Sequence, residues 1–197
     1  MADNAYSEIV NLYQPKKRFI IPIEKFHVPK KLYKLFKQNT YTFKINNNFE
    51  KVISKCQLAN RKDNGTWINS IILDSYLNLH YAKMAHSVEC YDQDKLVGGL
   101  YGVHIGGCFF GESMFSEISN TSKFCLLYLI AILKKNLFSL LDSQFYNEHL
   151  IQFGAFEIHN KIYLEKLSAS INYNRIFTFI DNFQEVLSLL QPNNHKS

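Results

Sequence analysis

Residues 85–116, AHSVECYDQDKLVGGLYGVHIGGCFFGESMFS, predict three consecutive β-strands. The polar stretch Asp92–Lys95 between apolar runs is typical of a hairpin turn. A second turn falls at Gly106-Gly107, where glycine adopts a positive φ at little cost. The third strand, residues 108–111, runs into Glu112-Ser113. A carboxylate at the end of a buried strand indicates a function or a partner, because desolvating a charge is costly.

Outward from this stretch, apolar periodicity and turn residues predict alternating helices and strands. Pro22 places the first strand at a sheet edge, because proline cannot donate to a ladder. The expected elements are strands 19–23 and 41–45, helices 30–37, 49–59, 67–83, 122–136 and 147–153, and a central strand 137–145. This order predicts an α+β fold with a mixed sheet, which binds ligands where its strands end.

The charge is unevenly distributed along the 197 residues, whose net charge is +5. Residues 16–62 carry thirteen lysines and arginines but only two acidic residues, both glutamates. A polar break in the sequence follows at residues 63–66. We therefore expect a small basic N-terminal lobe, residues 1–62, and a catalytic domain, residues 63–197. A basic segment suggests a polyanion partner such as nucleic acid, although a solvated lysine surface explains the charge equally well.

Several classes of protein do not fit the sequence. The four cysteines, at positions 56, 90, 108 and 125, lack metal-ligand spacing, and no HExxH or phosphate-loop motif is present, so neither a metal nor a cofactor is expected. The longest apolar run, residues 124–133, is too short to span a bilayer. Without an export signal at the start, we expect a cytoplasmic monomer with no membrane contact.

Two polar clusters are candidates for catalysis. Asp142 and Gln144 alternate on a predicted strand and therefore face the same side, where a carboxylate can orient an amide that hydrogen-bonds substrate. Glu112 joins them if the two strands are neighbours. Taken alone, the pair is better explained as the polar end of a strand, and the cap of a helix beginning at Met114 would explain Glu112.

Taken in order, these segments closely resemble the leucyl/phenylalanyl-tRNA–protein transferase family over residues 65–167. The motifs that carry the resemblance are GTWI (65–68), LH (79–80), AHSVE (85–89), LVGGLYGV (96–103), FFGESMFS (109–116), SK (122–123), LLDSQ (140–144), HL (149–150) and FGAFEI (153–158).

The resemblance implies a GNAT-like acyltransferase fold and transfer of leucine or phenylalanine, sometimes methionine, from aminoacyl-tRNA to a protein's α-amino group. Acceptors begin with arginine or lysine and are marked for degradation under the N-end rule; acidic N-termini are an alternative. By position, the implied catalytic residues are Asp142, Gln144 and Glu112. The implied donor-binding residues are Trp67, Tyr76, Phe109 and Met114. The helix lysines Lys30, Lys31, Lys34 and Lys37 are expected to contact tRNA phosphates.

Two other functions compete with this interpretation. An acyl-CoA enzyme would need a glycine-rich loop before a helix, and residues 112–120 lack it. A non-catalytic RNA-binding module would explain the lysines without the polar clusters. The family's usual longer N-terminal part, with a G-x-F-P-W element, has no counterpart here, so we expect part of the donor pocket or the adenosine platform to be absent or rebuilt, which leaves the donor preference open.

Overall fold

The computed structural model describes residues 1–59 and 66–191, and in it one seven-stranded sheet runs through the protein in the order β2-β3-β4-β5-β6-β1-β7. The pair β5–β6 is parallel and the other pairs are antiparallel. The strands are β1 Lys17–Ile21, β2 Thr42–Ile45, β3 Ala85–Asp92, β4 Lys95–Ile105, β5 Cys108–Ser116, β6 Leu140–Gln144 and β7 Phe156–His159. The helices are α1 Lys30–Lys37, α2 Phe49–Leu58, α3 Ser70–Tyr81, α4 Thr121–Lys135, α5 Glu148–Ile151, α6 Asn160–Ile171 and α7 Phe183–Leu190. The predicted α+β class with a mixed sheet is confirmed.

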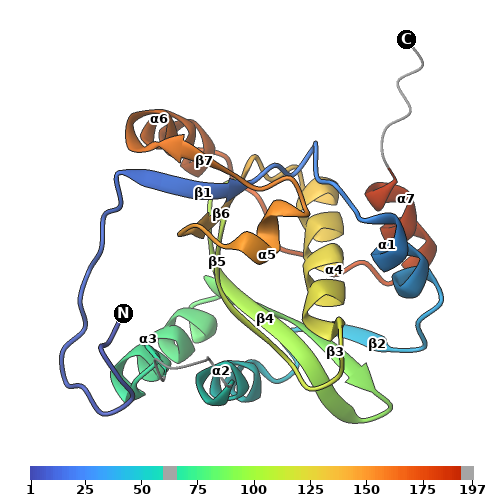
Figure 1. Cartoon of the computed structure of the whole chain (residues 1–197), viewed down its shortest axis with the longest axis horizontal. Coiled ribbons are helices and arrows are strands. Elements are labelled where there is room, and N and C mark those ends of the chain that lie inside the picture. The colour runs from blue at the N-terminus through green and yellow to red at the C-terminus, as the bar shows by residue number, and fades with distance from the viewer. Residues whose placement is uncertain (60–65, 192–197) are drawn as a thin grey trace.

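Helices cover both faces of the sheet (Figure 1). Alternating side chains of a strand point to opposite faces, so each strand contributes to two cores. Val88 and Leu100 pack in the core under α4, whereas Tyr91 and Tyr101 pack in the core under α2 and α3. The helix α4 is apolar nearly all round and is buried along almost its whole length, as its sequence predicts. None of the described helices is both long and apolar enough to span a bilayer.

Two strands from the first 62 residues belong to this same sheet. β2 pairs with β3, and β1 lies between β6 and β7. The expectation of an edge position for the first strand is therefore wrong: Pro22 follows the last paired residue, Ile21, so no ladder hydrogen bond is lost. The break expected at residues 63–66, and with it the domain boundary at residue 62, lies almost wholly outside the described residues; Thr66 alone is described.

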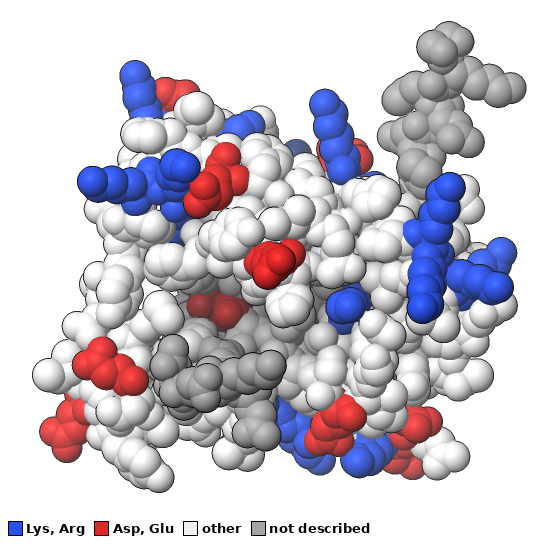
Figure 2. Space-filling view, viewed as in Figure 1, with Lys and Arg blue, Asp and Glu red and all other residues white. Residues whose placement is uncertain are grey.

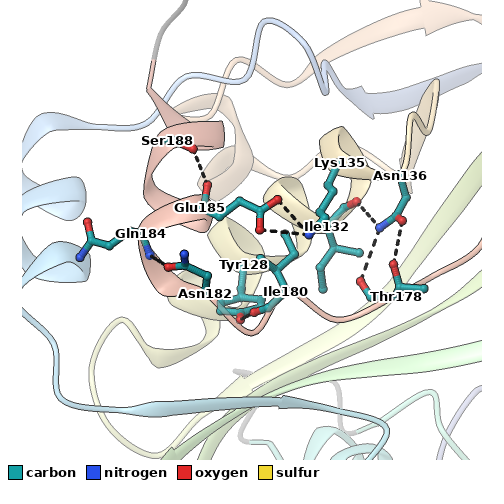
Figure 3. A network of polar contacts seen from close by, with 10 residues as sticks. All are labelled: Tyr128, Ile132, Lys135, Asn136, Thr178, Ile180, Asn182, Gln184, Glu185 and Ser188. Atoms are coloured by element: carbon teal, nitrogen blue, oxygen red, sulfur yellow. Dashed lines mark hydrogen bonds and ion pairs between the residues drawn. The ribbon is translucent and has the colours of Figure 1, made fainter.

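The segment after α6 is fastened to α4 by polar contacts (Figure 3). Tyr128 donates a hydrogen bond to the carbonyl of Ile180, and Asn136 and Thr178 bond through their side chains at 2.8 Å. Lys135 pairs with Glu185 at 2.8 Å. These contacts hold α7 beside the central helix, so the last of the described helices completes the core on that face.

Gly102 allows β4 and β5 to approach each other, which leads to a stability prediction. A Cβ at Gly102 would lie 2.3 Å from the carbonyl oxygen of Phe110 and 2.4 Å from the ring of Phe109. Gly102→Ala should therefore destabilise the protein by about 1–3 kcal/mol, measured by urea unfolding. Gly111→Ala is the control, because its Cβ would lie 3.7 Å from the nearest atom, the carbonyl oxygen of Asp142. Equal losses in both variants would contradict the steric explanation.

Candidate active site

The pairing of β5 with β6 stops early, and the site lies where it stops. The parallel register ends at Phe110 and Asp142, whereas β5 continues to Ser116. On its other side β5 pairs with β4, with Tyr101 opposite Ser113 but Gly102 opposite Gly111, so Glu112 is the extra residue of a β-bulge. The alternative explanation, in which Glu112 caps a helix beginning at Met114, is wrong, because β5 continues through Glu112 to Ser116. Glu112 therefore lies just beyond the last paired residues of β5 and β6.

A second bulge lies opposite, in β6. Phe19 pairs with Gln144 and Ile20 with Asp142, so Ser143 is the extra residue, and its hydroxyl donates to the carbonyl of Phe19 at 2.8 Å. Gln144 follows in the left-handed region, with φ of 70°. The simple alternation assumed from the sequence for Asp142 and Gln144 is thus interrupted by a bulge and a left-handed residue. A left-handed non-glycine residue costs about 1–2 kcal/mol and needs support from its surroundings.

Asp142 supplies that support from a buried position. Its Oδ1 accepts the backbone N–H of Gln144 at 2.7 Å, and its side chain has no exposed surface. Its Oδ2 accepts from the guanidinium of Arg18 and from the hydroxyl of Tyr163, the latter at 2.7 Å. The carboxylate is therefore fully engaged with protein groups, and it serves Gln144 through the backbone.

Glu112 completes the cluster. The Nε2 of Gln144 donates to the carbonyl of Gly111 at 3.2 Å, and the Gln144 and Tyr76 side chains also hydrogen-bond Glu112. Burial raises the pKa of Glu112 above its ordinary value, while the hydrogen bonds from Gln144 and Tyr76 oppose the rise. Burial also raises the pKa of Tyr76, helped by the neighbouring charge of Glu112, so the tyrosine stays a neutral donor.

Two cavities meet at Glu112, one on each face of the sheet. The larger, of about 670 Å³, is lined by apolar residues that include Leu100, Met114, Leu126, Leu129 and Leu141, and by polar residues that include Ser122, Lys123, Asp142, Ser143, Asn147 and His149. The smaller, of about 350 Å³, is lined by Trp67, Tyr76, Phe110, Arg18 and Gln144. Glu112 lines both. An apolar cavity with a few convergent polar groups is typical of a binding site for a small apolar group.

The expected donor-binding residues divide between these cavities, with one exception. Trp67 and Tyr76 line the smaller cavity and Met114 lines the larger one. Phe109 lines neither: it is fully buried beneath Gly102 and stacks on Phe177 with ring centroids 5.4 Å apart. Its neighbour Phe110 lines the smaller cavity instead. The one-residue difference follows from the pleat, which sends adjacent side chains to opposite faces.

The four expected tRNA-binding lysines all lie exposed on α1: Lys30, Lys31, Lys34 and Lys37. Figure 2 shows basic atoms gathered over this helix, on a face that is also hollowed near its middle, with acidic atoms inside the hollow. The lysines of α1 and the hollow therefore lie on the same face of the molecule.

Sequence reasoning missed Arg18 and Tyr163, which the fold brings to Asp142. Arg18 lies at the start of an apolar strand, with its side chain 15% exposed, in a chain whose basic residues are mostly lysines. An arginine preceding the apolar residues 19–21 is the signal that could have found it, because arginine is favoured over lysine for pairing with a buried carboxylate. Tyr163 carries no such signal: it lies in α6, twenty-one residues beyond Asp142.

The chain is similar in sequence to known transferases. Residues 20–168 match the family model described as leucyl/phenylalanyl-tRNA protein transferase. A protein of that name from Hyphomonas neptunium is 42% identical over 177 residues, covering 90% of this chain and 69% of the relative. Another from Desulfotalea psychrophila is 46% identical over 156 residues, covering 78% of this chain and 68% of the relative.

Among solved structures, L-PGS from Bacillus licheniformis overlaps with a TM-score of 0.43 at 16% identity, covering 88% of this chain and 59% of that one. This overlap is too partial to bear on function.

The burial of Glu112 predicts a pH-dependent stability difference. Because its pKa is raised in the folded state, the native protein loses stability as pH rises above the ordinary value of 4.5, where the half-buried Glu112 has to ionise in a poorly solvated place. Glu112→Gln removes this cost. The variant should therefore match the wild type below pH 4.5 and become more stable than it at higher pH, measured by denaturant unfolding between pH 4 and pH 8.

Glu117→Gln is the control of opposite sign. Hydrogen bonds from Lys55 and Lys95 lower the pKa of Glu117, so its stabilisation is present above pH 4.5 and is lost as pH falls. This variant should be less stable than the wild type near pH 7 and should approach it in acid. The same pH trend in both variants would contradict the role assigned to burial.

Proposed function

Because the chain belongs to the leucyl/phenylalanyl-tRNA protein transferase family, we propose that it transfers leucine or phenylalanine, with methionine as a further donor, from aminoacyl-tRNA to protein N-termini. The acceptors are proteins that begin with arginine or lysine, which the added residue marks for degradation. The observation that carries the proposal is the meeting of two cavities at Glu112, beside Gln144. The protein acts as a cytoplasmic monomer without a metal or cofactor.

The two cavities suit the two ends of an aminoacyl ester. The larger cavity has the apolar lining and the volume that a leucine or phenylalanine side chain needs. The smaller one presents Trp67 and Tyr76, whose aromatic rings can stack on the terminal adenosine. With the side chain on one face of the sheet and the nucleoside on the other, the ester lies in the gap beside Glu112.

The reaction needs the amine to be positioned beside the ester carbonyl, and it needs one group that accepts a proton. The acceptor's amine nitrogen forms a bond to the ester carbonyl carbon, and the bond from that carbon to the ribose oxygen breaks. Glu112 takes the proton that the attacking amine loses and passes it to the departing ribose oxygen, so no proton is gained or lost overall. A carboxyl group with a raised pKa is a better base near neutral pH than an ordinary one. Gln144 orients the amine, and Asp142 acts through the Gln144 backbone.

The lysines of α1 hold the tRNA. Their exposed ammonium groups contact phosphates, which positions the adaptor without reading its sequence. The contacts release counterions, so binding weakens as salt rises.

The decisive experiment is transfer itself. Purified protein is mixed with labelled leucyl-, phenylalanyl- or methionyl-tRNA and with peptides that begin with Arg, Lys, Asp, Glu or Ala. We expect transfer to the Arg and Lys peptides. Transfer only to the Asp and Glu peptides would show that the acceptors begin with acidic residues instead. Binding of tRNA without any transfer would favour an RNA-binding module.

Gln144→Ala should lower kcat about 100-fold or more, because the amine loses its orienting group. The circular dichroism spectrum and the unfolding midpoint should stay close to those of the wild type, since the side chain is only partly buried. Gln152→Ala, which removes an exposed amide from the surface, is the matched control. An active Gln144→Ala enzyme would refute the assignment.

Each lysine-to-glutamine change among the four helix lysines should weaken tRNA binding and reduce the slope of log K against log salt by about 1. Binding is measured by filter retention across a salt series. Lys166→Gln, on the exposed side of α6, should leave the slope unchanged. If Lys30→Gln and Lys166→Gln give the same slope of log K against log salt, the tRNA binds somewhere other than α1.

A further inference from the structure

We propose that Arg18, together with Tyr163, is a positioning residue for the transfer reaction: the two hold Asp142 in the one orientation that supports the left-handed backbone of Gln144. The inference rests on the proposed function for its kinetic test. It concerns two residues that never contact the reacting atoms in the scheme above.

Three elements meet at Asp142, and only their packing brings the groups together. Arg18 comes from β1, Asp142 from β6 and Tyr163 from α6. The Nη2 of Arg18 and the hydroxyl of Tyr163 both bind Oδ2 of Asp142. The guanidinium also lies over the Tyr163 ring, 4.7 Å from its centroid, and 3.4 Å from its hydroxyl. The arginine and tyrosine therefore fix each other as well as the carboxylate.

The two oxygens of Asp142 have separate tasks. Oδ2 is held by Arg18 and Tyr163, whereas Oδ1 accepts the N–H of Gln144 at 2.7 Å. A carboxylate is planar, so fixing one oxygen fixes the direction of the other. Without the Oδ2 partners the carboxylate can turn away, and Gln144 loses the charge-assisted hydrogen bond that offsets its backbone strain.

Stability alone does not account for the arrangement. Asp142 is fully buried and the side chain of Arg18 is only 15% exposed, and an ion pair so far removed from water contributes little net stability because desolvation offsets the attraction. Within the described residues the Nε of Arg18 is buried without a hydrogen-bond partner, which is a further cost. What the cluster does provide is a fixed backbone geometry at Gln144, the residue that enters the site.

The kinetic test uses Arg18→Ala. Misplacement of Gln144 should lower kcat about 10- to 100-fold, while KM for leucyl-tRNA stays within about threefold of the wild type. Methylguanidinium at millimolar concentration should restore part of the rate, because Arg18 lines the smaller cavity and its removal opens space there. Arg18→Lys should retain more activity than Arg18→Ala, and Tyr163→Phe should show an intermediate loss.

Lys17→Ala is the matched control. Lys17 precedes Arg18 on the same strand and forms an exposed pair with Glu157 at 3.2 Å, away from the cluster. Its loss removes the same charge and should leave kcat unchanged. A rise in KM with unchanged kcat in Arg18→Ala would make Arg18 a donor-binding residue and overturn the proposal. A loss of activity that only tracks the fraction unfolded, without rescue, would overturn it too.

A second measurement does not depend on transfer. Amide exchange by NMR should show faster exchange at the Gln144 N–H in Arg18→Ala than in Lys17→Ala, with the neighbouring β5 amides unchanged. Uniform acceleration across the sheet, or none at Gln144, would contradict positioning. If the wild-type protein transfers no amino acid, the proposed function fails, and the exchange data still decide whether Arg18 holds Gln144.

Discussion

The early end of the pairing between β5 and β6 is the constraint on which the site depends. The two strands share hydrogen bonds only as far as Phe110 and Asp142, and each then carries a bulge. A continuous ladder would have closed the sheet there. The gap instead leaves Glu112 in contact with cavities on both faces, so one carboxyl group can serve a ligand that passes from one side to the other.

The gap requires polar groups in a buried place, and their interactions explain how the protein tolerates them. Glu112 has a raised pKa because burial disfavours its charged form, and hydrogen bonds limit the rise. Asp142 is deeper but has a cation, a hydroxyl and a backbone N–H as partners. The two carboxyl groups therefore differ in their surroundings: Glu112 lines both cavities, whereas both oxygens of Asp142 are bound by protein groups.

Much of the fold could be predicted because hydrophobic period and turn residues are local signals. The hairpin at residues 85–105, the buried helix α4 and the basic helix α1 follow the sequence closely. The edge position expected for the first strand was wrong, because proline excludes only the residue that carries it, and strand order is set by packing between distant segments. The sequence also predicts too early an end for β5, since a bulge carries the strand past Glu112 to Ser116.

The sequence by itself determined the family, the α+β class and the presence of Glu112, Asp142 and Gln144 as polar groups beside apolar strands. Only the tertiary structure decided how they act together. Bulges shift side-chain direction by one residue, Phe109 enters the core while Phe110 meets a cavity, and Arg18 and Tyr163 reach Asp142 from 124 and 21 residues away. Such contacts depend on which strands become neighbours, and no local pattern in the chain records that.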